Sequence, residues 1–233
     1  MKTGMIATLA GLALAGSASA SFTEFYTVKT TVTNTGLGGP VSLDVYKIYA
    51  RFNGPTDTIL NAFNLNGLAG APMAAFYHKD NASGNTGSLM TGFGTWNPAL
   101  TGSATANRPF DSYLTIGGLP TATNGTSADP SWGNPASWNR ADIPNNVNAG
   151  WFAPGGSIAG RVGQAGNTAD SVILGQFVVA AGTGFGGGYS ITIGYNSGVA
   201  GAPVQFANGF FLVPAPGAIA LLGLAGLTGR RRR

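Results

Sequence analysis

The sequence predicts an all-β fold, an antiparallel β-sandwich of the jelly-roll or cohesin-like kind with long loops rich in Gly, Asn and Pro. Three observations lead to this prediction. Runs rich in β-branched and aromatic residues recur along the chain, turn-forming residues separate them, and no long stretch has the 3.6-residue apolar repeat of a helix. The composition agrees, because 38 glycines and 13 prolines in 233 residues favour turns, while 44% hydrophobic residues are enough for a core.

The expected strands follow one another with turn residues between them. The second strand has Val41, Leu43 and Val45 on one face. Tyr46 and Ile48 make the opposite face apolar as well, which indicates burial on both sides or a bulge. In chain order, we expect strands at 22–33, 41–52, 58–65, 73–77, 112–116, 171–181, 189–195 and 204–212.

The strongest local signal lies near the end of the body. Two strand runs, 172–179 and 189–193, flank the glycine-rich segment 182–188. This pattern predicts an antiparallel hairpin. The same glycines do not form a dinucleotide-binding loop, because a strand-like run follows them where such a loop requires a helix.

The net charge of +4 comes from the two ends of the chain. Lys2 and the last four arginines are five of the 12 basic residues, so seven remain against eight acids, and the body carries 7 − 8 = −1. A body without a basic face excludes nucleic acid as a partner.

The first 20 residues have the three parts of a secretory signal peptide. Lys2 gives the positive start, residues 5–16 are apolar, and Ala18 and Ala20 form the small-residue site that signal peptidase accepts. The apolar stretch is short for a membrane span, which needs about 20 residues. We expect cleavage before Ser21 and export of the mature protein.

The last 21 residues form a second three-part signal. Val213, Pro214, Ala215 and Pro216 make an extended, non-helical elbow. An apolar stretch at 218–229 predicts a short hydrophobic helix, and Arg230, Arg231, Arg232 and Arg233 follow it as a stop-transfer cluster that stays on the cytoplasmic side. The tail is either cleaved or retained as an anchor in the inner membrane.

This tail resembles the PEP-CTERM sorting signal of bacterial envelope and exopolysaccharide-associated proteins. Residues 213–216 occupy the place of the family's Pro-Glu-Pro motif, with Ala215 where the family has glutamate. The resemblance covers only the tail. It implies recognition by a membrane transpeptidase-like enzyme called exosortase, delivery to the cell surface or extracellular matrix, and exopolysaccharide as a candidate partner.

The residues of the body contain no recognisable catalytic or metal-binding motif. The chain has no cysteine and one histidine, His78, which excludes cysteine nucleophiles and multi-histidine metal sites. The spacing G-x-S-x-G does not occur, and the run that starts at Asp80 lacks the donor positions of a calcium loop. We expect no catalytic residue, metal or cofactor; an unrecognised hydrolase that uses some of the seven aspartates is an alternative.

The segment 99–156 lacks periodicity and is expected to be an inserted loop. Within it, Trp132 and Trp138 are candidate platforms for sugar rings, with Asn134 and Asn139 as hydrogen-bonding partners. The competing interpretation, which we favour, is that these tryptophans fold inward and stabilise the loop.

Together these patterns divide the chain into three parts: a signal peptide at 1–20, a β-sandwich ectodomain at 21–212, and a sorting or membrane segment at 213–233. We expect an exported, non-enzymatic protein of the cell surface or exopolysaccharide matrix with a structural or interaction role. A carbohydrate-binding module is the first alternative.

Overall fold

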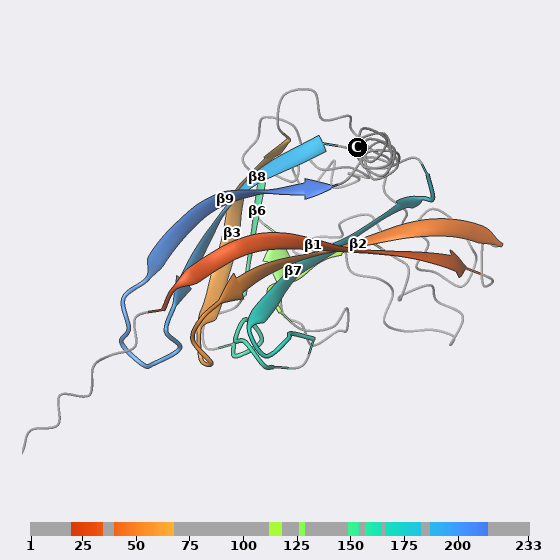
Figure 1. Cartoon of the computed structure of the whole chain (residues 1–233). Coiled ribbons are helices and arrows are strands. Elements are labelled where there is room, and N and C mark those ends of the chain that lie inside the picture. Colours follow the sequence, from red (N-terminus) through yellow and green to blue (C-terminus); the bar gives the residue numbers. More distant parts are fainter. Residues whose placement is uncertain are drawn as a thin grey trace, which may run out of the picture.

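The computed structural model describes residues 20–34, 40–67, 112–117, 126–128, 149–153, 157–164, 166–182 and 187–213. These residues form nine strands in two antiparallel sheets (Figure 1). The expected all-β sandwich is therefore confirmed. The expected strand at 73–77 and the hydrophobic helix at 218–229 lie outside the described residues.

The four-stranded sheet has the order β1-β2-β7-β4. Its strands are β1 (Phe22–Asn34), β2 (Val41–Phe52), β7 (Ser171–Ala180) and β4 (Tyr113–Leu114). The first two of these pair over almost their whole length and form a long hairpin.

The five-stranded sheet has the order β5-β6-β3-β8-β9. Its strands are β5 (Ser127–Ala128), β6 (Ala149–Phe152), β3 (Thr58–Gly67), β8 (Gly187–Asn196) and β9 (Gln205–Val213). Two of the strands, β5 and β6, fall inside the segment 99–156 that the sequence predicts to be irregular.

The main core lies between the two sheets and takes alternate residues from each strand. Tyr46 and Ile48 of β2 are buried there with Ile193 of β8. The odd-numbered residues Leu43 and Val45 are also buried, in a separate cluster on the other face of the four-stranded sheet. The β2–β7 register shifts between residues 48 and 49 as well. Burial on both faces of β2 and a bulge are therefore both present.

The prediction that residues 172–193 form an antiparallel hairpin is wrong. β7 pairs with β2 and β4 in one sheet, whereas β8 pairs with β3 and β9 in the other. Both strands are apolar enough to be buried, and their alternation contains no information about which neighbour each one takes. The hairpins that form are β1–β2 and β8–β9.

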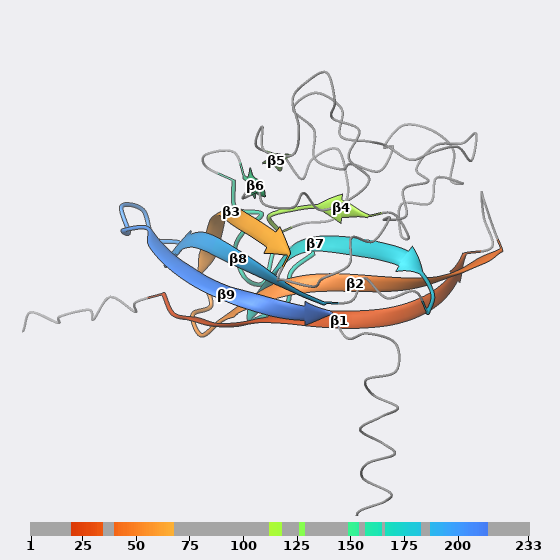
Figure 2. The ribbon, with the colours of Figure 1, turned by 90° about the horizontal axis from the view of Figure 1, so that it is seen from above.

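The edge strands of the two sheets, β1 and β9, lie beside each other (Figures 1 and 2). The ring of Phe25 on β1 packs over Gly209 on β9, where a Cβ would come within 2.7 Å of the ring. The far end of the β1–β2 hairpin extends beyond β8 and β9 in both views. Along this side of the sandwich, the contact between the two sheets includes the Phe25 ring of β1 packed against Gly209 of β9.

A single indole joins the two sheets on another side. Trp151 of β6 is 2% exposed, and its Nε1 donates a hydrogen bond of 2.9 Å to the carbonyl oxygen of Thr115, which directly follows β4. Of the three tryptophans in 99–156, this one is folded inward as structural packing. Within the described part of the chain, no helix is long and apolar enough to cross a membrane.

Candidate functional site

The two sheets differ sharply in charge. Every Asp, Glu, Lys and Arg that lies on a described strand belongs to β1 or β2: Glu24, Lys29, Asp44, Lys47 and Arg51. The described strands of the five-stranded sheet contain none. The side chains that these strands can offer to a ligand are therefore apolar, aromatic or neutral hydrogen-bonding groups.

The outer face of the five-stranded sheet is the best candidate for a binding site. We call it the aromatic–amide face, because exposed or half-buried phenylalanines alternate on it with amide and hydroxyl side chains. Its members are Asn61, Phe63 and Asn64 of β3, Phe152 of β6, Thr192 of β8, and Phe206, Asn208 and Phe210 of β9.

The most exposed members lie on β9. Phe206 and Phe210 are 65% and 61% exposed, and they alternate with Ala207 and Gly209, which face the sandwich. This inverts the usual strand pattern, in which large apolar side chains point inward. On the inner side of β9, the Phe25 ring of the neighbouring edge strand fills the space beside Gly209, and Phe211 is buried in the main core.

A glycine positions one row of the face. Gly194 of β8 lies between Asn61 of β3 and Phe206 of β9 in the sheet register. A Cβ at Gly194 would lie 2.5 Å from Asn61 Oδ1 and 3.3 Å from the Phe206 ring. The absent side chain lets the Gly194 amide donate a 3.0 Å hydrogen bond to Asn61 Oδ1. Phe152 pairs with Asn61 on the other side and is 45% exposed.

The neighbouring row is held by side-chain hydrogen bonds. Thr192 donates its hydroxyl proton to Asn208 Oδ1 at 2.8 Å, and the Asn64 amide donates to the Thr192 hydroxyl at 3.5 Å. Asn64 has a φ of 55°, in the left-handed region that asparagine tolerates better than most residues. It lies where the β3–β8 register shifts. Phe63 of the same row meets the Phe206 ring edge to face at 6.1 Å.

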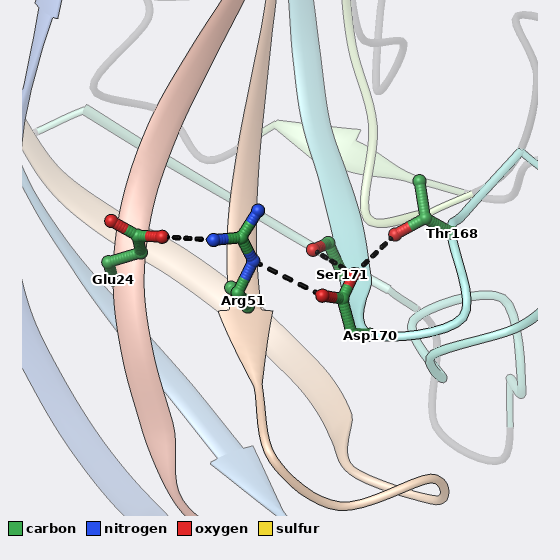
Figure 3. Close-up of polar contacts among 5 residues, drawn as sticks. All are labelled: Glu24, Arg51, Thr168, Asp170 and Ser171. Carbon is green, nitrogen blue, oxygen red and sulfur yellow. Dashed lines mark hydrogen bonds and ion pairs between the residues drawn. The ribbon is translucent and has the colours of Figure 1, made fainter.

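A second cluster of polar groups lies on the four-stranded sheet (Figure 3). Arg51 forms ion pairs with Glu24 of β1 and with Asp170, whose Oδ2 is 3.2 Å from Arg51 Nε. Asp170 also accepts hydrogen bonds of 2.8 Å from Ser171 and Thr168. The Ser171 hydrogen bond, then that of Thr168, and the Arg51 charge hold the pKa of Asp170 below its usual value. The cluster joins β1 and β2 to the segment before β7.

A buried ion pair lies near the end of the same sheet. Asp44 is 1% exposed and accepts from Lys29 at 2.9 Å, Thr31 at 2.6 Å and the amide of Gly182 at 3.1 Å. Burial alone would raise the pKa of Asp44, but these hydrogen bonds together hold it below its usual value. The hydrogen bond to Asp44 raises the pKa of Lys29.

The described carboxylates are spread over three places and have structural partners. Glu24 and Asp170 share Arg51, Asp44 is paired with Lys29, and the buried Asp57 accepts from the amide of Gly54 at 3.1 Å in a turn. The residues that the structure describes contain no group of His, Asp and Glu able to hold a metal ion. His78, Asp80, Asp111, Asp129 and Asp142 lie outside the described residues.

Only the inner boundaries of the two expected transport signals fall in the described structure. Ala20 is buried against the main core, and the carbonyl oxygen of Ser21 accepts a 3.1 Å hydrogen bond from the Asn53 amide. Val213 is the last residue of β9 and pairs with Gly187. The remaining residues of the two signals are outside the described residues: Ala18, Pro214, Ala215, Pro216, Arg230, Arg231, Arg232 and Arg233.

The candidate carbohydrate site of the inserted loop lies outside the part of the chain that the structure describes. Trp132, Asn134, Trp138 and Asn139 all lie outside the described residues. The aromatic–amide face was missed by sequence reasoning. A signal for it exists in the strand 204–212, where Phe206, Asn208 and Phe210 alternate with small residues, although sequence alone does not tell which side of the strand is inside.

Comparisons with protein-family models, curated protein sequences and solved structures gave no match to this chain. The functional interpretation therefore depends on its own residues.

Proposed function

We propose that this chain is an exported protein of the cell surface or the extracellular polysaccharide matrix, with a structural and interaction role and no enzymatic step. Its aromatic–amide face is the surface through which it interacts. The observation that carries the proposal is this uncharged face, with two phenylalanines more than 60% exposed. Exposed apolar side chains gathered on one face mark an interaction surface.

The two ends of the sequence support export and sorting. The first strand begins at Phe22, directly after the expected signal-peptidase site, and the last strand ends at Val213, directly before Pro214. The described strands thus lie between the two expected processing sites. Under this proposal the inner membrane is a transient partner or an anchor in transit.

The hydrolase alternative receives less support. A glycosidase needs one carboxylic acid that stays protonated near neutral pH beside a second that is ionised. The two described carboxylates that share a partner, Glu24 and Asp170, both form ion pairs with Arg51, and the pKa of Asp170 is lowered rather than raised.

The proposal predicts where the chain is found in the producing cell. Antibody detection after fractionation is expected to place it at the surface or in the matrix, where protease added to intact cells degrades it. Replacing Arg230 to Arg233 with alanine removes the stop-transfer charges and is expected to deplete the membrane-associated form. Lys47→Ala, which removes a cation from the body, is the matched control and is expected to sort normally. A chain found only in the cytoplasm would refute the proposal.

A further inference from the structure

From the chemistry of the aromatic–amide face we infer that its ligand is an uncharged polysaccharide, bound as an extended chain of pyranose rings across β3, β8 and β9. This inference rests on the proposed function and gives its interaction surface a ligand class. The site consists of residues other than those of the tryptophan candidate in the inserted loop.

The phenylalanine rings fit the apolar faces of pyranose rings. An aromatic ring carries partial negative charge on its face, and the C–H bonds of a sugar carry partial positive charge, so the two surfaces attract each other while both lose water. Phe206 and Phe210 are four residues apart on β9, which is about 13 Å along an extended strand. Two rings at this spacing suit a ligand longer than one sugar unit.

The amides supply the hydroxyl contacts. The Oδ1 atoms of Asn61 and Asn208 already accept hydrogen bonds from Gly194 and Thr192. Among the described residues, no hydrogen bond leaves the NH2 group of either amide. The fold thus fixes each oxygen and leaves the NH2 donors for hydroxyl oxygens of a ligand.

The same NH2 groups argue against an apolar occupant. A hydrophobic segment would cover the donors of Asn61 and Asn208 with apolar carbon, and each donor without a partner costs roughly 1–3 kcal/mol. A polysaccharide instead provides an oxygen acceptor on every ring. The described strands of the five-stranded sheet offer no cation to pair with a phosphate or carboxylate, which favours an uncharged ligand.

Affinity electrophoresis of the full 233-residue chain tests the inference. The probes are native gels that contain hydroxyethyl cellulose, laminarin, galactomannan, xylan or dextran, with alginate as the anionic comparison. We expect retardation in at least one neutral gel, little or none in alginate, and the same retardation at 50 and 500 mM salt, because neutral contacts are not screened.

Two variants separate the face from the rest of the surface. Phe206→Ala with Phe210→Ala removes two exposed rings and is expected to weaken retardation at least fivefold, with unfolding little changed. Val28→Ala, which removes a 43% exposed apolar side chain from the four-stranded sheet, is expected to bind as the wild type. Asn208→Leu, which removes a donor but keeps the volume, is expected to weaken binding as well.

Three results would overturn the inference: no retardation in any neutral gel, equal retardation of the double phenylalanine variant, or dimerisation that the same double variant abolishes. None of them bears on export, because the measurement uses purified protein. A chain that is exported but binds no neutral polysaccharide refutes the ligand class alone, and a cytoplasmic chain refutes the proposed function alone.

Discussion

At the scale of single residues, Asp44 is a buried carboxylate whose charge is compensated by hydrogen bonds and an ion pair. It is nearly inaccessible, yet it has three donors: a lysine, a hydroxyl and a backbone amide. An alternation of apolar and polar residues does not reveal which side chains of the adjacent strand reach Asp44, and Lys29 reaches it from a position opposite Tyr46. The structure places Thr31 directly across from it.

This pairing predicts a pH-dependent contribution to stability. Since the pKa of Asp44 is lowered in the folded state, its contribution is present above about pH 4, the unfolded value, and is lost as the pH falls through the lowered folded value. Since the pKa of Lys29 is raised, its contribution persists below about pH 10 and is lost as the pH rises through the raised folded value. Asp44→Asn is therefore expected to lower the free energy of unfolding by about 1–3 kcal/mol at pH 7.

Urea unfolding at pH 7 and at pH 2 checks this expectation, and the difference from wild type should shrink at the lower pH. Asp170→Asn is the matched control: its carboxylate is 54% exposed, so its ion pair is expected to contribute less than about 1 kcal/mol. An effect of Asp170→Asn as large as that of Asp44→Asn would contradict the assignment of Asp44 as the buried partner.

At the scale of elements, the sequence predicted the long strands well and their partners poorly. The runs at 22–33, 41–52 and 58–65 correspond to β1, β2 and β3, because each is long and rich in β-branched or aromatic residues. The sequence did not predict the short strands β5 and β6, since two to four residues are too few to show the two-residue alternation of a strand. The false hairpin between β7 and β8 has the same origin: pairing depends on contacts far apart in sequence.

The aromatic–amide face illustrates the same limit for the site. Its polar members come from β3, β8 and β9, which only the sheet order brings together. The alternation in β9 was visible, but the packing of Phe25 against Gly209 and the burial of Phe211, which accompany the outward position of Phe206 and Phe210, were not. The charge balance of the body, by contrast, was readable from the sequence, where it argued against nucleic acid as a partner.

The indole contact of β6 gives a prediction at this scale. Trp151→Phe keeps an aromatic ring in the core but leaves the Thr115 carbonyl oxygen without its donor, at a point where the two sheets are joined. We expect a loss of about 1–3 kcal/mol in the free energy of unfolding, measured by urea denaturation. Phe152→Leu, the exposed neighbour on the same strand, should change stability by less than about 0.5 kcal/mol. Equal effects of the two substitutions would show that the hydrogen bond contributes little.

At the scale of the whole molecule, the charged residues include two distinct groups, one at the two ends of the chain and one on β1 and β2. The basic residues at the two ends give the chain its net charge of +4 and, in our proposal, direct export and sorting. The charges of β1 and β2 tie strands of one sheet together, and the other sheet has none. After removal of both ends the body is close to neutral, which suits a protein that lies among uncharged polymers.

The intact mass of the surface or matrix form shows whether this sandwich is processed at both ends. We expect a chain that begins at Ser21 and lacks the residues after about Pro216, and therefore all four terminal arginines. A mature protein that begins at Met1, or one that still carries Arg230 to Arg233, would contradict this expectation.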